Sequence, residues 1–182
     1  MHGTEAPSTW VTRWTPLLPP QSRVLDLACG AGRHMQWLAH HGHHCLGIDR
    51  SAEALSAAKA FGQVMEADIE DGPWPLTGQT FDAVIVTNYL WRPLLPRILE
   101  SLKPQGFLIY ETFALGHEKI GKPSRPDFLL KPGELLQTCA QMHVIAYEDG
   151  LLADPPFSKR NSNKRQFRRI NDQRRNLPIS KN

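Results

Sequence analysis

A glycine-rich turn between a predicted strand and a predicted helix is the first feature of the sequence that could support chemistry. It runs from Asp26 to His34 and reads Asp-Leu-Ala-Cys-Gly-Ala-Gly-Arg-His. Glycine at positions 30 and 32 lets the backbone turn tightly and lets a ligand approach where a Cβ atom would intrude. The third glycine of a nicotinamide dinucleotide fingerprint is replaced by Met35, and no lysine follows as in a P-loop. The turn therefore predicts a ligand site that is built for neither pyrophosphate nor triphosphate.

Three carboxylates lie at or beyond the ends of predicted strands. Asp49 closes the second strand, where a carboxylate can accept two hydrogen bonds from a ribose diol. Asp68 follows the third strand and is placed to accept from the exocyclic amine of an adenine. Asp26 in the turn suits a cationic group, directly or through water. These positions predict contacts with a ribose, an adenine and a cation.

The elements that must position these residues alternate between short apolar runs and helical patterns. Six runs are predicted to be strands, at 24–27, 45–49, 63–67, 81–87, 107–111 and 143–147. Several are apolar on both faces, which is typical of strands covered by helices on both sides. Helices are expected at 33–41, 52–61, 96–102 and 133–140. This order predicts βαβ units and an α/β fold with a Rossmann-like, doubly wound, mostly parallel sheet.

The order and spacing of these motifs resemble the class I S-adenosylmethionine-dependent methyltransferases. The matching stretches are VLDLACGAGRH at 24–34, GIDRS at 47–51, EADIE at 66–70, FDAVIVTNYL at 81–90 and LKPQGFLIYET at 103–112. Within that superfamily the chain is similar to small bacterial methyltransferases of unassigned substrate, related to tellurite-resistance and ubiquinone-biosynthesis-like enzymes. The resemblance implies an enzyme that uses S-adenosyl-L-methionine as its cofactor.

The resemblance also implies where that cofactor is held. Gly30 and Gly32 would pack against its methionine and ribose portions, and Asp26 would lie near its amino group. Asp49 would bind the ribose hydroxyls. The family pattern has a glycine where this chain has Ala28, a small residue that should be tolerated. The complete set of expected cofactor-binding residues is Asp26, Ala28, Gly30, Gly32, Asp49, Arg50, Asp68, Ile69 and Asn88.

The residues after the fourth and fifth strands are expected to meet the methyl acceptor. These substrate candidates are Tyr89, Trp91, Arg92, Thr112 and Phe113. Trp91 could stack on a planar acceptor and Arg92 could bind an anion, with simple packing as the alternative for both. The Asn-Pro-Pro-Tyr signature of many amino-group methyltransferases is absent, which weakens adenine-N6 and glutamine as targets.

Catalysis of methyl transfer requires mainly that the acceptor is aligned with the carbon–sulfur bond and that water is excluded. A general base is needed only if the acceptor must lose a proton. The sequence offers four candidates for a base by position alone, namely Tyr89, Tyr110, Glu111 and His117. Each of them suits a structural or solvent-facing role better.

Histidines and cysteines do not form the spacing of a metal site. His40, His41, His43 and His44 straddle Gly42 at a turn on the side away from the carboxyl ends of the strands. Surface histidines are the expected outcome there, and no metal is predicted. Three cysteines are too few and too scattered for a zinc site or a disulfide framework.

The charge of the chain is concentrated at its carboxyl end. The net charge of +3 combines 12 Lys+Arg against 17 Asp+Glu in residues 1–156 with 9 Lys+Arg against Asp172 alone in residues 157–182. The fold that the chain resembles ends in an antiparallel seventh strand between the fifth and sixth. Residues 165–170 predict at best a short, poor strand, so the seventh strand is doubtful on sequence grounds.

Two interpretations of this basic tail are open. It is either an arm that binds RNA or another polyanion, with an affinity that falls steeply with salt, or an altered reading frame or divergent end that leaves the sheet incompletely paired. The abrupt change in composition favours the second interpretation.

We therefore predict three segments: an N-terminal cap segment at 1–22, a methyltransferase core at 23–156 and a basic tail at 157–182. Trp10 and Trp14 in the first segment share a helical face, as a lid over the cofactor or as part of the core. No apolar stretch approaches the ~18 residues of a membrane span and no secretory signal is visible, so we expect a cytoplasmic enzyme without a membrane partner. Its expected activity is methyl transfer to a small-molecule acceptor. The alternatives are an RNA-directed methyltransferase that uses the tail and a catalytically inactive cofactor-binding protein.

Overall fold

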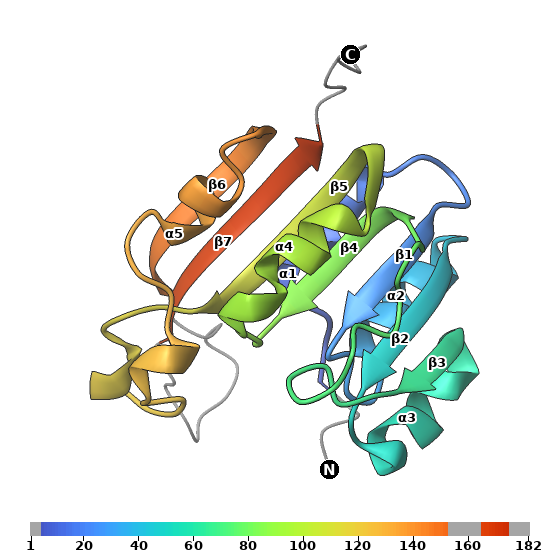
Figure 1. The fold of residues 1–182 in the computed structure, drawn as a ribbon, viewed down its shortest axis with the longest axis horizontal. Coiled ribbons are helices and arrows are strands. Elements are labelled where there is room, and N and C mark those ends of the chain that lie inside the picture. The colour runs from blue at the N-terminus through green and yellow to red at the C-terminus, as the bar shows by residue number, and fades with distance from the viewer. Residues whose placement is uncertain (1–4, 153–164, 175–182) are drawn as a thin grey trace.

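Seven strands form one sheet in a computed structural model that describes residues 5–152 and 165–174 (Figure 1). The strands are β1 (Arg23–Leu27), β2 (His44–Asp49), β3 (Gln63–Glu66), β4 (Phe81–Thr87), β5 (Leu102–Phe113), β6 (Met142–Leu152) and β7 (Arg165–Arg174). Their order across the sheet is β3-β2-β1-β4-β5-β7-β6. The first five run parallel, whereas β7 is antiparallel to both of its neighbours. The predicted Rossmann-like, mostly parallel α/β fold is confirmed.

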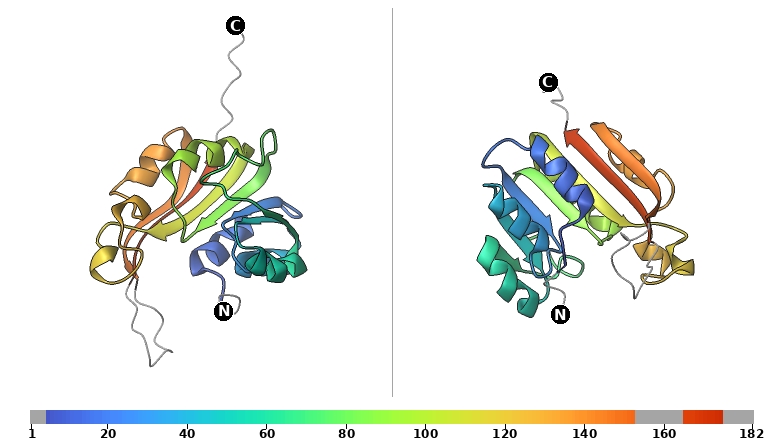
Figure 2. Two further views of the ribbon diagram at one scale, coloured as in Figure 1. Left: turned by 60° about the horizontal axis from the view of Figure 1, so that its bottom comes forward. Right: turned by 180° about the vertical axis from the view of Figure 1, so that it is seen from behind.

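Helices cover both faces of the sheet, as the strands with two apolar faces predicted (Figures 1 and 2). The helices α1 (Thr9–Trp14), α2 (Arg33–His40) and α3 (Ala52–Ala58) lie on one face, and α4 (Leu95–Glu100) and α5 (Glu134–Thr138) lie on the other. The side chain of Ser51 accepts a hydrogen bond from the amide of Ala54 at 3.2 Å and so caps α3. None of the helices in the described part of the chain is both long and apolar enough to cross a membrane.

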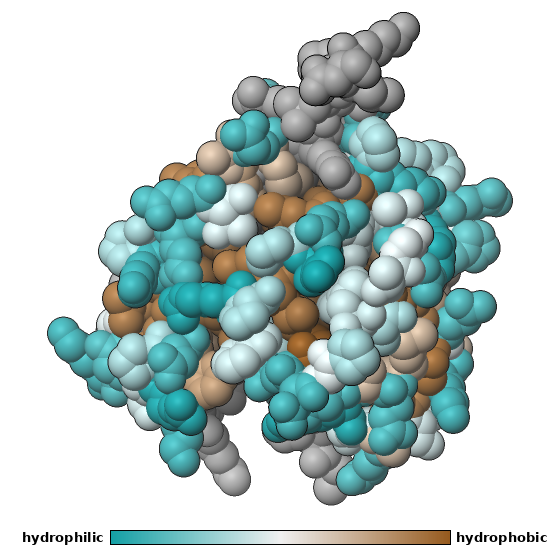
Figure 3. Space-filling model, viewed as in Figure 1, coloured by the Kyte–Doolittle hydropathy of each residue, from teal (hydrophilic) through white to brown (hydrophobic). Residues whose placement is uncertain are grey.

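Each face of the sheet has its own hydrophobic core. Val24, Met35 and Ile85 belong to the core under α1, α2 and α3, whereas Leu25 and Val84 belong to the core under α4 and α5. Neighbouring residues of one strand alternate between the two cores because successive side chains point to opposite faces. On the α4 side no helix connects β3 to β4, and apolar surface remains visible between polar side chains (Figure 3).

The N-terminal segment packs against the core. Trp10 is 1% exposed, and its ring meets that of Trp14 edge-on at 5.5 Å. Arg13 lies over the Trp14 ring at 4.9 Å and forms an ion pair with Glu148 of β6 at 3.0 Å. These contacts fix α1 on the sheet, so core packing accounts for the two tryptophans.

The expected gap in the sheet is absent, because β7 is a ten-residue strand paired on both sides. Its Cα register places Arg169 level with Glu111 of β5 and Glu148 of β6, and Ile170 level with Tyr110 and Tyr147. Backbone pairing on both sides of β7 therefore joins β5 to β6 in one sheet. The doubt about the seventh strand was therefore wrong, while the rest of the predicted basic tail lies outside the described residues.

Candidate active site

The sheet reverses its strand order between β1 and β4, and a crevice opens at their carboxyl ends. In open α/β sheets such a switch point is where ligands bind. Ala28 follows β1 and Asn88 follows β4, and each has φ of 55°. This left-handed conformation is uncommon for residues other than glycine. Two neighbouring strand ends therefore turn sharply, and the position where the family has glycine requires a conformation that glycine favours.

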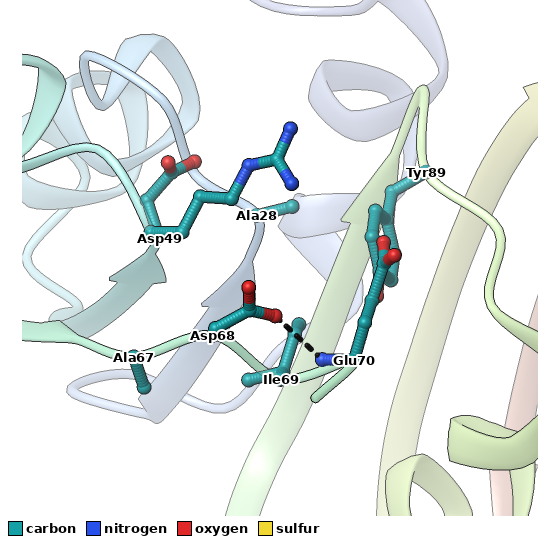
Figure 4. Close-up of a pocket in the computed structure, with 8 residues that line it drawn as sticks. Ala28, Asp49, Ala67, Asp68, Ile69, Glu70 and Tyr89 are labelled. Carbon is teal, nitrogen blue, oxygen red and sulfur yellow. Dashed lines mark hydrogen bonds between the residues drawn. The ribbon is translucent and has the colours of Figure 1, made fainter. Parts of the chain in front are cut away.

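Three adjoining cavities make up the crevice. The acidic cavity, of about 150 Å³, is lined by Ala28, Asp49, Arg50, Ala67, Asp68, Ile69, Glu70 and Tyr89 (Figure 4). The glycine-turn cavity, of about 220 Å³, is lined by Glu5, Ala28, Cys29, Gly30, Ala31, Arg33, His34, Thr87, Asn88 and Tyr89. The aromatic cavity, of about 200 Å³, is lined by Glu70, Asn88, Tyr89, Leu90, Thr112, Phe113, Pro123 and Phe128. Tyr89 lines all three, so they meet at this residue.

The carboxylates of the acidic cavity are oriented by backbone amides. Asp49 accepts hydrogen bonds from the amide of Gly30 at 2.8 Å and from that of Ser51 at 2.9 Å. The Oδ1 atom of Asp68 accepts from the amide of Glu70 at 3.0 Å, which leaves its Oδ2 atom for a ligand. Asp49, Asp68 and Tyr89 surround the open space of the cavity (Figure 4). The two predicted acids are thus brought together at one end of the crevice.

The two glycines of the turn have different roles. Gly30 has φ of +55°, and a Cβ atom added to it would meet no protein atom within 4 Å, so it leaves room for a ligand. Gly32 has φ of +81°, and a Cβ atom there would lie 2.9 Å from the Cβ of Ala58 in α3. Gly32 lines none of the three cavities. The structure therefore brings Gly30 to the ligand site and uses Gly32 for the close packing of α2 on α3.

Asp26 lies beneath the glycine turn, and the structure does not bring it into the crevice. It is 1% exposed, and neither carboxylate oxygen has a hydrogen-bond partner among the described residues. Burial raises the pKa of Asp26 to about 7. His34 is also buried, and burial together with the charge of Arg33 lowers its pKa to about 3. A neutral histidine therefore faces an acid that titrates near neutral pH.

The substrate candidates separate into two groups. Thr112 and Phe113 line the aromatic cavity together with Tyr89. Trp91 instead packs against the core on the α4 side. Arg92 forms an ion pair with Glu134 at 2.6 Å and donates to the carbonyls of Asp127 at 2.7 Å and Leu129 at 2.9 Å. The structure thus uses Arg92 to hold the loop before α5, and not as an anion site in the crevice.

Three of the four base candidates make contacts with other residues, and the fourth, Tyr89, lies at the centre of the crevice. The Tyr110 hydroxyl donates to the carbonyl of Tyr89 at 2.9 Å. Glu111 accepts from the Ser8 hydroxyl at 3.1 Å. His117 stacks on Phe113 at 4.6 Å between ring centroids. Burial and the neighbouring carboxylate of Glu70 raise the pKa of Tyr89, which disfavours a phenolate.

Two groups at the crevice were missed by the sequence analysis. Glu70 lines both the acidic and the aromatic cavity, although it belongs to the same short motif as Asp68. Its place two residues after Asp68 could have indicated that Glu70 also lies at the crevice. Pro123 and Phe128 come from the long connection between β5 and α5, where no periodic pattern indicates which residues turn inward. Among the described residues no three His, Cys, Asp or Glu side chains form a metal-binding group.

Comparisons with known proteins show what the part of the chain around this crevice is similar to. Residues 24–106 match the family described as methyltransferase domain. This part of the chain, which holds Ala28, Asp49, Asp68 and Asn88, is therefore similar to a methyltransferase domain. YqeM of Bacillus subtilis, provisionally named a methyltransferase, is 33% identical to this chain over an alignment 122 residues long that covers 59% of this chain and 49% of YqeM. The chain thus spans about half the length of this curated relative.

Solved structures of methyltransferases share the fold of this chain. TehB from Haemophilus influenzae superimposes with a TM-score of 0.79 at 17% identity, over 96% of this chain and 64% of TehB. An S-adenosylmethionine-dependent methyltransferase from Mesorhizobium loti superimposes with a TM-score of 0.66 at 18% identity, over 87% of this chain and 94% of that one. The predicted resemblance to the class I methyltransferases is confirmed.

Proposed function

We propose that the protein is an S-adenosyl-L-methionine-dependent methyltransferase that transfers a methyl group by in-line displacement to a small-molecule acceptor. The observation that carries the proposal is the crevice at the switch point of the methyltransferase domain. Asp49 and Asp68 line the acidic cavity and Gly30 lines the glycine-turn cavity, and the aromatic cavity adjoins both. We also propose that the enzyme acts in the cytoplasm, since Cys29, Cys45 and Cys139 form no disulfide within the described part of the chain.

The residues of the crevice fit the cofactor. Asp49 can accept from ribose hydroxyls while it keeps its bonds to the backbone, because each carboxylate oxygen has more than one acceptor site. The free Oδ2 atom of Asp68 can accept from the adenine amine. Gly30 leaves space in the glycine-turn cavity for the methionine portion. When bound, the cofactor supplies a sulfonium methyl group, which is a strong electrophile.

The chain itself then has to align an acceptor and exclude water. Tyr89 and Asn88 border both the glycine-turn cavity and the aromatic cavity, so they lie between cofactor and acceptor in this proposal. Tyr89, Phe113 and Phe128 give the third cavity aromatic walls, which help to exclude water from an acceptor. Orientation of this kind supplies much of the acceleration in a displacement that needs no covalent enzyme intermediate.

Calorimetric titration with S-adenosyl-L-methionine tests the proposal. We expect micromolar affinity for the wild-type protein and a loss of at least tenfold in Asp49→Ala, because a charge-assisted hydrogen bond is removed. Asp49→Asn keeps an oxygen for the Gly30 amide and separates loss of the ribose contact from collapse of the turn. Asp71→Asn is the matched control, since Asp71 is exposed and lines none of the three cavities. A folded wild-type protein that binds no cofactor would contradict the proposal.

A further inference from the structure

We infer that the aromatic cavity takes the methyl acceptor as a protonated amine and that Glu70 recognises its ammonium group. The inference rests on the proposed function and names the substrate class of that site. It starts from one placement: Glu70 is shared by the acidic and aromatic cavities, at the junction where an acceptor would meet the cofactor.

The position of the aromatic cavity suits an acceptor. It shares Glu70 and Tyr89 with the acidic cavity, and Asn88 and Tyr89 with the glycine-turn cavity. A molecule inside it therefore borders both parts of the crevice that hold the cofactor in the proposed function. At about 200 Å³ the cavity has room for a small organic molecule.

The chemistry of the cavity wall favours a cation with an apolar body. Phe113, Phe128 and Tyr89 provide aromatic surface, and Glu70 is the one charged side chain among the lining residues. A carboxylate forms its strongest hydrogen bonds with charged donors, and aromatic rings attract cations over their faces. An anionic acceptor would meet like charge at Glu70 and find no cation in the wall.

Two arginines that lie near the wall residues in sequence are engaged elsewhere. Arg92, which the sequence offered as an anion site, is held by Glu134 and two backbone carbonyls. Arg125 forms an ion pair with Asp127 at 3.0 Å and lies over the ring of Phe128 at 5.3 Å. Neither arginine lines the aromatic cavity, and neither does the exposed Lys122 beside Pro123. Arg50 lines the acidic cavity but not the aromatic one. Within the aromatic cavity, Glu70 is thus the charged group that can select the ligand.

The same carboxylate can prepare an ammonium group to accept a methyl group. An ammonium nitrogen has no free lone pair, so one proton must leave before it can act as a nucleophile. Transfer of that proton to an Oε atom of Glu70 yields a neutral amine and a neutral carboxyl group. Glu70 is exposed, so the proton can pass on to water and the carboxylate is restored.

Three probes of one shape and different charge test the inference: 2-phenylethylamine, 2-phenylethanol and phenylacetate. Each is titrated calorimetrically into the protein saturated with S-adenosylhomocysteine. We expect the amine to bind at least tenfold more tightly than the alcohol, and the acid more weakly than both. In Glu70→Gln the affinity for the amine should fall to that for the alcohol, while the affinity for the alcohol stays within about twofold. Asp71→Asn removes a neighbouring exposed carboxylate as the matched control and should leave the amine affinity unchanged.

Several results would overturn the inference. They are equal or tighter binding of the alcohol or the acid, an unchanged amine affinity in Glu70→Gln, and no binding of any probe. S-adenosylhomocysteine is titrated into each variant first. If the wild-type protein fails to bind it, the proposed function fails, and the amine titration without it still decides whether Glu70 selects a cation.

Discussion

The Oδ2 atom of Asp26 lies 3.8 Å from the Nδ1 atom of His34, and both side chains are almost completely buried. The Nε2 atom of His34 accepts a hydrogen bond from the backbone amide of Ser8 at 3.2 Å, so the single proton of its neutral ring lies on Nδ1 and faces the acid. The Ser8 hydroxyl in turn donates to Glu111 on β5. A chain of polar contacts therefore connects the N-terminal segment to the acid below the glycine turn.

Asp26→Asn should make the protein more stable at neutral and alkaline pH. The pKa of Asp26 is about 7 in the folded state and 3.8 as the ordinary value, so the folded state retains a proton that the unfolded state releases. Stability is therefore lost through this residue as pH rises from 4 to 7. We therefore compare the free energy of unfolding of the variant with that of wild type. The difference should grow from pH 4 to pH 7 and reach about 2–4 kcal/mol in favour of the variant at pH 8. Urea unfolding at several pH values measures it, and a flat difference would contradict the prediction.

His34→Gln should show the opposite pH dependence. The pKa of His34 falls from 6.5 to about 3 on folding, so below pH 6.5 the unfolded state takes up a proton that the folded state does not. This residue therefore costs stability as pH falls from 6.5 towards 3. The free energy of unfolding of the variant should therefore increase relative to that of wild type as pH falls, which the same series of urea unfolding experiments measures. Glutamine keeps an acceptor for the Ser8 amide. A difference that moves in the same direction as that of Asp26→Asn would show that the two groups are not buried as described.

Arg169→Pro should destabilise the sheet. Position 169 lies in β7 and is paired with Glu111 of β5 and Glu148 of β6, and proline has no amide hydrogen for a strand that is paired on both sides. We expect a loss of about 3 kcal/mol in the free energy of unfolding. Arg169→Lys keeps the amide and is the control, which should leave the urea midpoint unchanged. Equal urea midpoints for the two variants would contradict the pairing of β7 on both sides.

Arg92→Gln should lower stability without weakening cofactor binding. It removes a half-buried ion pair with Glu134 and two bonds to carbonyls, which together should cost about 1–3 kcal/mol. Arg97→Gln removes only an exposed pair with Glu100 and should cost less than about 0.5 kcal/mol. Thermal unfolding and calorimetric titration with S-adenosyl-L-methionine measure the two effects. If Arg92→Gln lost cofactor affinity at unchanged stability, Arg92 would belong to the site after all.

The parts of the fold that local patterns determine could be predicted from the sequence. The strands from β1 to β5 and the helices between them follow apolar runs and periodicity within a few residues of chain. The strand β7 could not, because it has few apolar residues and its pairing partners in β5 and β6 are distant in sequence. Pairing between distant strands cannot be read from a pattern along one strand.

The candidate site divides in the same way. Asp49, Asp68 and Gly30 were predicted because the end of a parallel strand fixes where they lie. The direction of a side chain depends instead on tertiary packing. Arg92 turns to Glu134 although it follows β4, and Phe128 reaches the crevice from a loop without periodicity. Strand ends are thus predictable from sequence, and side chains that reach across from other elements are not.

The position of β7 has a consequence for how the protein is made. It is the last described strand in the chain, yet it lies between β5 and β6. While the ribosome is still synthesising the chain, β5 is an open sheet edge, because the residues that pair with it, such as Gln173 opposite Phe107, have not yet been made. Unpaired edges of this kind invite aggregation, and pairing between distant segments is slow. The sheet is completed only when residues 165–174 have emerged, so the nascent chain passes through a stage in which a chaperone would have an exposed strand to protect.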